Sequence, residues 1–415
     1  MSSPSSGRAA GYTERRLGVA LLGSTGSIGR QAVDVLAAHP ERFRVVALAT
    51  DHDGALLAEQ ARRLRPDRIA LAMGSTADLD LPAGTSWIGG PDALEELVAL
   101  PGVDLVVVGT GGLVSLRPTL AALTAGRIVA TANKETLVAG GHLVMPLAGA
   151  LAAAVAADDP RSPAASPLAW LRPIDSEHGA IWQCLAGESR SAIARLILTA
   201  SGGPFLDASD AEIAAATPAT ALRHPTWRMG AKVTIDSATL ANKGLEVIEA
   251  HWLYDVGYDA IDVVVHPQSV VHSAVEFVDG SLKAQLGTPD MHLPIQYALT
   301  YPDRAPSPTS APDLVAGAGL TFRAPDERRF PALRIAREAG RMGSRASAAL
   351  IAADEVAVAR FLDGSLDFPG IPALLEEAVG RFGEGPDQAP DLDELVALDA
   401  EVRSAFAAPA REPSR

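Results

Sequence analysis

The chain has 415 residues, of which 48% are hydrophobic, enough for a large core and for two or three domains. Its 50 acidic residues outnumber 35 basic ones, and the net charge of −15 argues against nucleic acid or an anionic membrane as a partner. Cys184 is the single cysteine, which excludes a disulfide framework and a thiolate metal cluster. Because no run of about 18 apolar residues is uninterrupted, we expect no membrane-spanning segment and a cytoplasmic enzyme.

The first part of the chain alternates apolar strands with helices. Residues 1–16 are polar, and we expect them to form a disordered tail. Strands are expected within four later segments: 17–23, 43–50, 103–112 and 126–135. The alternation is typical of an α/β fold, in which helices cover both faces of a parallel sheet, and we place this Rossmann-like domain at 17–173.

A glycine turn follows the first strand, in the sequence "GSTGSIG" from Gly23 to Gly29. Glycines at such a turn allow a close backbone approach, and the helix that follows offers free N–H groups to a pyrophosphate. This predicts a dinucleotide-binding domain. Asp51 ends the second strand, where an acidic residue is typical of NAD and a basic residue of NADP.

The remaining chain divides into an α+β part and a helical part. The stretch "DDPRSPAASP" predicts a surface loop near 157–170, before a catalytic α+β domain at 174–300. Residues 301–325 read as a linker. A small helical domain at 326–415 follows, and we expect its last residues to be a polar tail.

Carboxylates gather in the segment "RPIDSEHGAIWQ", residues 172–183. Asp175 and Glu177 lie two residues apart, so in an extended segment both would point to the same face. Glu246, among apolar neighbours in "DSATLANKGLEVIE", is expected to face inward as well. Three carboxylates without thiolates favour a hard cation, Mg²⁺ or Mn²⁺.

Donors suited to a phosphate monoester occur in the same blocks. Ser237, Asn242 and Lys243 offer a hydroxyl, an amide and an ammonium, and Ser201 adds another hydroxyl. The lysines support this interpretation, because the chain holds only four among its 35 basic residues: Lys134, Lys232, Lys243 and Lys283. Where arginine serves as the general cation, a retained lysine favours a compact ammonium with a tunable pKa.

The motifs "GSTGSIG", "ANKE", "DSEH", "TASGGPF", "HPTWRMG", "DSATLANKGLE", "HPQSVVHS" and "QLGTPDM", in this order, resemble those of the 1-deoxy-D-xylulose 5-phosphate reductoisomerase family. The resemblance covers about residues 17–400. It implies rearrangement of a phosphorylated ketose followed by reduction with NADPH, and it implies a homodimer. It also implies that Asp175, Glu177 and Glu246 hold the divalent metal.

The resemblance assigns further roles to residues of this chain. It implies catalytic roles for Lys134, Glu177 and His178, and closure over the substrate by Trp227, which would lie on a flap. The residues expected to contact substrate are Lys134, Ser176, Glu177, Ser201, His224, Trp227, Ser237, Asn242, Lys243, Glu246 and His272. Those expected to contact the cofactor are Ser24, Thr25, Gly26, Ser27, Ile28, Asp51, Asn133, Glu135, Met229 and Gly230. For His178, His224 and His272 an ordinary structural role stays open.

The sequence departs from the family pattern at three places, one of which is His292, where an arginine usually follows the "PDM" motif. Asp51, His52 and Asp53 replace a loop that is commonly basic, so NADH is not excluded as the cofactor. The usual "NAANE" reads "IAADE" at 351–355, which we expect to lie far from the chemistry. One alternative is a paralogue that uses NADH, resists an inhibitor or acts on a related ketose. Another is an inactive regulatory protein, which the intact carboxylates and Lys134 disfavour.

Overall fold

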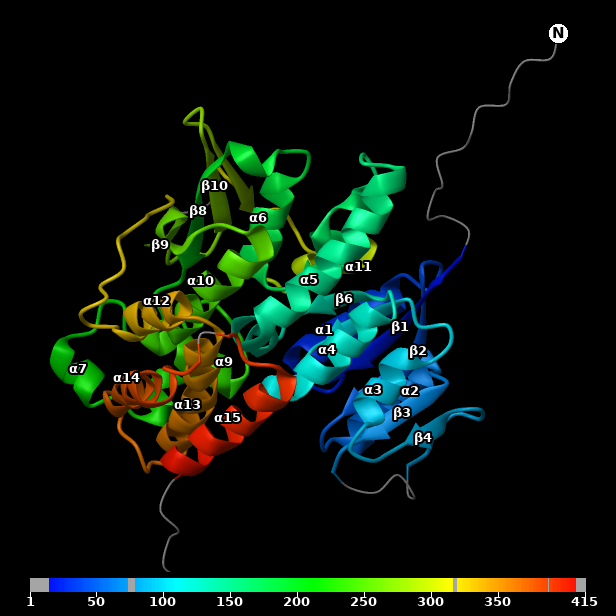
Figure 1. The fold of residues 1–415 in the computed structure, drawn as a ribbon, viewed down its shortest axis with the longest axis horizontal. Coiled ribbons are helices and arrows are strands. Elements are labelled where there is room, and N and C mark those ends of the chain that lie inside the picture. Colours follow the sequence, from blue (N-terminus) through cyan, green and yellow to red (C-terminus); the bar gives the residue numbers. More distant parts are fainter. Residues whose placement is uncertain (1–14, 74–78, 316–318, 387, 408–415) are drawn as a thin grey trace, which may run out of the picture.

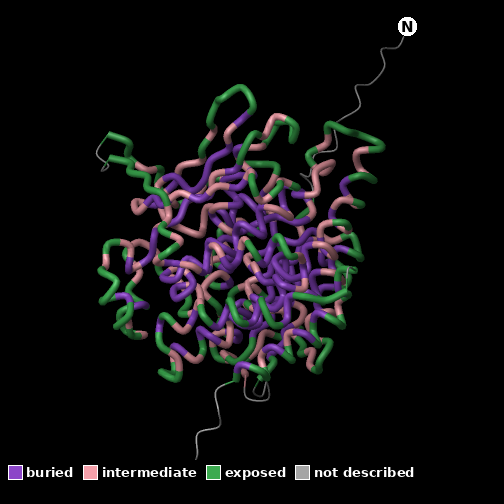
Figure 2. Tube along the Cα trace, turned by 60° about the vertical axis from the view of Figure 1, so that its left-hand side comes forward, coloured by how far each residue is buried: buried purple, intermediate pink, exposed green. Residues whose placement is uncertain are grey.

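The computed structural model describes residues 15–73, 79–315, 319–386 and 388–407. The first fourteen residues of the expected tail lie outside this description. The described chain contains two sheets, each with helices packed against it, and a group of C-terminal helices (Figure 1). Buried residues gather in the centre of the molecule, and exposed residues lie mainly in the outer loops and turns (Figure 2).

The first sheet is parallel and has seven strands in the order β4-β3-β2-β1-β5-β6-β7. Its strands are β1 Leu17–Leu22, β2 Phe43–Thr50, β3 Arg68–Leu71, β4 Ser86–Ile88, β5 Leu105–Val108, β6 Ile128–Thr131 and β7 Leu171–Pro173. The central strands are buried runs of Val, Leu and Ala, as a sheet covered on both faces requires. This confirms the predicted Rossmann-like α/β fold.

The strand order reverses between β1 and β5, and this places a crevice at the carboxyl ends of those strands. One group of packed helices contains α1 Ser27–Ala38, α2 Gly54–Leu64 and α11 His292–Thr300. A second contains α3 Ala93–Ala99, α4 Leu116–Thr124 and α5 Lys134–Asp158. Short 3-10 turns at Leu113–Ser115, Pro163–Ala165 and Pro167–Ala169 complete this part, the last two within the predicted surface loop.

The second sheet has the order β11-β10-β8-β9, with β8 and β9 parallel and the other pairs antiparallel. Its strands are β8 Ile193–Ala200, β9 Ile261–Val265, β10 Val271–Phe277 and β11 Leu282–Leu286. Helices α6 Ser176–Leu185 and α10 Ala241–Tyr254 pack against it. Between β8 and β9 also lie α7 Asp210–Ala214, α8 Pro218–Ala221, α9 Ala231–Thr239 and a 3-10 turn at Tyr258–Ala260. Another 3-10 turn, at Arg190–Ala192, precedes β8.

The C-terminal helices are α12 Ala332–Met342, α13 Ser344–Leu362, α14 Gly370–Phe382 and α15 Leu392–Phe406. Helix α13 packs against the other three and also against α5 and α9, so it joins this group to both sheets (Figure 1). The expected polar tail at the end of the chain falls mainly on residues 408–415, which lie outside the described residues, and α15 precedes them. Asp391 and Glu394 form a capping box at its start, and Leu395, Leu398 and Val402 are buried.

Among the described residues, one helix, α5, is long and apolar enough to cross a membrane by length and composition. Its buried residues lie mostly in its first half, and the helix packs against α4, α10 and α13. A core helix of this kind passes the same test, so its composition is weak evidence for a membrane span.

Candidate active site

The glycine turn carries the nucleotide side of the site. Gly23 has φ +79, and a Cβ on Gly29 would lie 2.1 Å from the Gly23 carbonyl oxygen, so both positions require glycine. Helix α1 begins after Gly26 without any side-chain cap, so its first N–H groups are free to bind a phosphate group. Ser27 and Ile28 of this turn line a pocket that also contains Lys134, Asp175 and Glu177.

Ser24 and Thr25, which lie within the glycine turn, are held in place by hydrogen bonds to residues of α2 and β2. Ser24 is buried, and its carbonyl accepts a hydrogen bond of 2.8 Å from Gln60. The hydroxyls of Thr25 and Thr50 are hydrogen-bonded. Asp51 is 67% exposed and lies 3.3 Å from the His52 ring, so its carboxylate is accessible at the end of β2.

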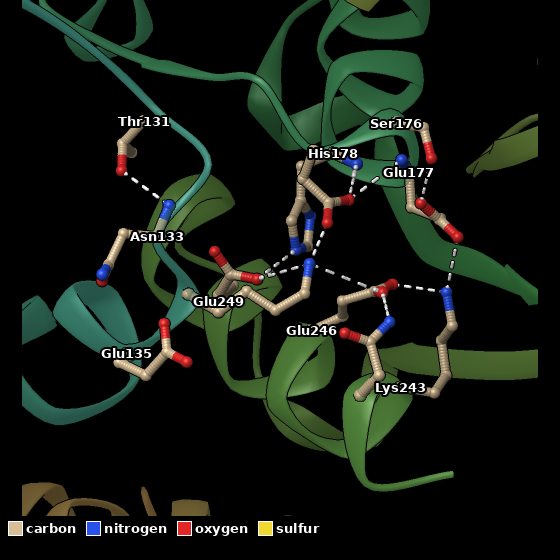
Figure 3. A network of polar contacts seen from close by, with 12 residues as sticks. Thr131, Asn133, Glu135, Ser176, Glu177, His178, Lys243, Glu246 and Glu249 are labelled. Carbon is tan, nitrogen blue, oxygen red and sulfur yellow. Dashed lines mark hydrogen bonds and ion pairs between the residues drawn. The ribbon is translucent and has the colours of Figure 1, made fainter. Parts of the chain in front are cut away.

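Asn133 connects the first sheet to α5. Its side-chain oxygen accepts a 2.6 Å hydrogen bond from the N–H of Thr136, which caps α5. Its amide donates to the carbonyls of Thr110 and Gly112, at 2.9 and 2.8 Å. These bonds fix the first turn of α5, which begins with Lys134 and Glu135. Asn133 and Glu135 are shown in Figure 3.

The three expected metal ligands come together, although their local structure was wrongly predicted. Asp175 and Glu177 lie at the start of helix α6, where an extended segment was expected. The Asp175 carboxylate caps this helix by accepting from the N–H groups of Glu177 and His178, at 3.0 and 3.3 Å. Glu246 reaches the same point from α10, and one ligand oxygen of each carboxylate lies within 4.8 Å of the others.

The charges at this point fit a divalent cation. Burial, together with the nearby carboxylate of Glu177, raises the pKa of Glu246 to about 8. Burial would also raise the pKa of Asp175, but the ammonium of Lys134 lowers it below its ordinary value. Oxygen ligands that converge in a buried site and repel one another form the donor set that Mg²⁺ or Mn²⁺ prefers.

A fourth carboxylate, Glu249, was not anticipated. It is buried on α10, with its Oε2 3.7 Å from Lys134 Nζ and 3.3 Å from His178 Nε2 (Figure 3). Burial acts to lower the pKa of Lys134, but Asp175, Glu246 and Glu249 raise it well above its ordinary value. The only sequence signal for Glu249 was its place one helical turn beyond Glu246, which puts both on one face of α10.

The expected phosphate donors line one pocket of about 180 Å³ together with the carboxylates. The predicted residues that line it are Ser27, Ile28, Lys134, Asp175, Ser176, Glu177, Ser201, Trp227, Met229, Gly230, Ser237, Asn242, Lys243 and Glu246. Lys243 Nζ lies 2.8 Å from Glu177 Oε1, and Asn242 donates a 2.6 Å hydrogen bond to Glu246. Ser176 donates to Glu177.

Residues 222–230, between α8 and α9, form a segment that we call the flap. His224 Nδ1 accepts from the N–H of Trp227 at 2.8 Å, so in the neutral ring Nε2 carries the proton and donates to Ser201 Oγ at 2.9 Å. Burial lowers the pKa of His224, which favours this neutral form. The Trp227 ring lies 6.0 Å from that of His272, so the flap contacts the pocket wall.

Several predicted residues lie behind the pocket wall instead of lining it. His178 is fully buried beside Glu249, and His272 is buried behind Trp227. Glu135 lies 3.4 Å from Lys232, a residue that we had not placed at the site. Lys232 also contacts Asp354, so the segment 351–355 is linked through Lys232 to the residues behind the pocket wall, although it does not line the pocket itself.

A dinucleotide-type sheet, three converging carboxylates and a pocket lined with phosphate donors together define a metal-dependent and nucleotide-dependent enzyme. Models of the 1-deoxy-D-xylulose 5-phosphate reductoisomerase family match residues 19–141, with C-terminal domain models at 171–254 and 286–405. The reductoisomerase of Pelotomaculum thermopropionicum is 48% identical over 93% of this chain and 96% of its own length. That of Symbiobacterium thermophilum is 48% identical over 94% and 97%. The chain therefore belongs to the 1-deoxy-D-xylulose 5-phosphate reductoisomerase family.

Solved structures agree with this assignment. The enzyme of Zymomonas mobilis in complex with NADPH has a TM-score of 0.82 and 37% identity, covering 95% of this chain and 98% of that chain. A second reductoisomerase, in complex with NADPH, fosmidomycin and magnesium, has a TM-score of 0.84 and 37% identity, covering 94% and 97%.

Proposed function

We propose that this protein converts 1-deoxy-D-xylulose 5-phosphate into 2-C-methyl-D-erythritol 4-phosphate, with NADPH and a divalent metal, in the methylerythritol phosphate route of isoprenoid biosynthesis. The observation that carries the proposal is the convergence of Asp175, Glu177 and Glu246 in a pocket that also contains Ser237 and Lys243. When bound, the metal polarises the ketone and hydroxyl of the substrate, and NADPH supplies the hydride.

The residues of this chain divide the remaining work. Lys243, with Ser201, Ser237 and Asn242, binds the phosphate group through charge-assisted hydrogen bonds. Lys134, kept protonated by the carboxylates around it, donates hydrogen bonds to substrate oxygens as their charge develops. His178 is held in place by Glu249 behind Asp175 and so orients this wall of the pocket.

Two further elements bind the cofactor and exclude water. The free N–H groups at the start of α1, after Gly26, hold the pyrophosphate. Met229 and Gly230 line the pocket together with Ser27 and Ile28 of that turn, so this side of the pocket would receive the nicotinamide. Asn133 and Glu135, at the start of α5, would support it from behind the pocket wall. Trp227 covers the pocket from the flap, and its closure protects an aldehyde intermediate from water.

Nicotinamide oxidation by the purified protein tests this function. The assay contains 1-deoxy-D-xylulose 5-phosphate and Mg²⁺, and it is run in parallel with NADPH and with NADH. We expect turnover with NADPH and a product with the chromatographic and mass properties of 2-C-methyl-D-erythritol 4-phosphate. Turnover with NADH alone would instead support the paralogue that the acidic Asp51 loop leaves open. No turnover with either cofactor would contradict the proposal.

We also propose that the protein is a homodimer in the cytoplasm. The family resemblance supports the dimer, as does the edge strand β11. Its first residue, Leu282, is 58% exposed, and Val278, which follows β10, is 70% exposed. The single, buried Cys184 is consistent with a reducing compartment. Light scattering measures the mass of the particle, and a mass equal to one chain across micromolar concentrations would contradict the dimer.

A further inference from the structure

Lys232 joins three buried carboxylates that come from different parts of the fold. Its Nζ lies 2.8 Å from Asp236 on the same helix, 2.6 Å from Asp354 on α13 and 3.4 Å from Glu135 on α5. Asp236 and Asp354 are each 1% exposed and Glu135 is 8% exposed. A buried ammonium with three carboxylate partners holds α5, α9 and α13 together, and none of the carboxylates is a proposed metal ligand.

This cluster lies at the C-terminal end of the flap. Gly230 ends the flap and precedes α9, and Lys232 is the second residue of that helix. Met229 and Gly230 line the active-site pocket, as does Val233 on the other side of Lys232. The position of Lys232 thus determines where the flap joins the rigid part of the molecule.

The electrostatics of the cluster depend on the lysine. Burial and the facing carboxylate of Asp354 raise the pKa of Asp236 well above its ordinary value, although Lys232 opposes this shift. Among the described residues, Asp236 Oδ1 and Asp354 Oδ1 have no hydrogen-bond partner. Lys232 is therefore the group that holds these two carboxylates next to each other, and without it they would repel.

A second connection runs from the C-terminal helices to the same region. Glu355, next to Asp354, pairs with Arg403 of α15 at 2.6 Å. A Cβ on Gly112 would lie 3.0 Å from Glu355 Oε1, so the carboxylate is packed against this loop. The carbonyl of Gly112 accepts from Asn133, which caps α5. The C-terminal helices thus support both the start of α5 and the flap.

We propose that Lys232 is a positioning residue, which holds the end of the flap over the pocket by tying it to Glu135 and to Asp354 of the C-terminal helices. The inference rests on the proposed function, because it concerns the binding of NADPH and the ketose phosphate. Lys232 touches neither ligand in this account and acts through Met229 and Gly230. Its loss should therefore weaken binding more than it slows the chemical step.

The test uses Lys232→Met, which keeps the length of the side chain and removes its charge. The apparent affinity for a ligand falls in proportion to the fraction of molecules whose flap is in the binding position. If this fraction falls to about a tenth in the variant, the KM values for NADPH and ketose phosphate rise about tenfold. We expect kcat to fall less than about threefold, because Lys134 and the metal ligands are unchanged. Lys283→Met is the matched control, since this lysine pairs with Glu188 on the surface and should behave as wild type.

Limited proteolysis distinguishes a change confined to the flap from destabilisation of the whole protein. Trypsin cuts after Arg228, which is exposed within the flap, and we expect about fivefold faster cleavage there in ligand-free Lys232→Met. Cleavage outside residues 222–232 should keep its wild-type rate. A folded Lys232→Met protein with wild-type KM values and wild-type cleavage after Arg228 would overturn the proposal.

Two outcomes require further experiments: a Lys232→Met variant that does not fold, and a wild-type protein without activity. If Lys232→Met fails to fold, Asp354→Ala is the second variant, because it removes the link to α13 and leaves Asp236 and Glu135 as partners of Lys232. A smaller fraction of the molecules should then lose the closed position of the flap, so we expect KM values about threefold higher than in the wild type. Wild-type KM values in Asp354→Ala would then contradict the proposal. If the wild-type protein has no activity, the proposed function fails, whereas the proteolysis comparison still tests the role of Lys232.

Discussion

Lys243 Nζ lies 2.8 Å from Glu177 Oε1, so the lysine expected to bind phosphate is paired with an expected metal ligand (Figure 3). Lys243 is also paired with Glu246, and burial, which acts to lower its pKa, is outweighed by the surrounding carboxylates, which raise it. Lys243 thus pairs with two of the three carboxylates that are expected to hold the metal. Binding of metal and substrate must therefore rearrange the same charges.

Lys243→Met should have opposite effects on the two ligands. It removes a charge-assisted hydrogen bond of about 1.5–3 kcal/mol, so the KM for the ketose phosphate should rise about 10- to 100-fold. It also removes a cation that competes for Glu177 and Glu246, so Mn²⁺ should bind more tightly. Steady-state kinetics and calorimetric titration measure the two effects. Weaker Mn²⁺ binding in the variant would show that Lys243 does not compete with the metal.

Glu246→Gln should leave the fold intact and abolish turnover. Burial and the carboxylate of Glu177 raise the pKa of Glu246 to about 8, so its charge is already disfavoured at this position and an amide of the same size should be tolerated there. The metal would lose one ligand, and kcat/KM should fall more than about 100-fold. Thermal unfolding checks the fold and nicotinamide oxidation the activity. Wild-type activity at limiting Mg²⁺ would remove Glu246 from the ligand set.

The fold and most of the site could be predicted from sequence because both depend on local patterns. Buried strands followed by a glycine turn predict a dinucleotide-type sheet, and these residues form β1 and α1. The helix at Asp175 was missed because the spacing of the two carboxylates was read as a strand pattern. An Asp followed by Ser and Glu is also a helix start, and Asp175 caps α6 in this way.

Lys232 and Glu249 could not be placed by such patterns. Their partners lie on other helices, 122 residues away for Lys232–Asp354 and 115 for Lys134–Glu249, as the residue numbers give by subtraction. No local rule brings these side chains together, since only the packing of α13, α9, α10 and α5 does so. The roles assigned to the individual site residues stay predictions, which the variants described here test.

Metal affinity should depend on pH through Glu246. Its raised pKa of about 8 means that below this pH the metal must displace a proton, so affinity should increase about tenfold per pH unit and level off above about pH 8. Calorimetric titration with Mn²⁺ between pH 6 and 9, in buffers of different ionisation enthalpy, measures the affinity and the protons released. In Glu246→Gln the slope should disappear. An unchanged slope in that variant would assign the proton to another group.

Cofactor selectivity should respond to Asp51, which lies at the end of β2 with 67% of its side chain exposed. A carboxylate there disfavours the 2′-phosphate of NADPH if the ribose lies within reach, whereas an arginine would bind it. Asp51→Arg should therefore raise the ratio of kcat/KM for NADPH to that for NADH about tenfold, as one charge-assisted hydrogen bond provides. Asp80→Arg, which changes an exposed aspartate on the loop before β4, is the charge-matched control and should leave the ratio unchanged. An equal ratio in Asp51→Arg and wild type would show that the 2′-phosphate lies away from this loop, so that selectivity comes from other residues around the glycine turn.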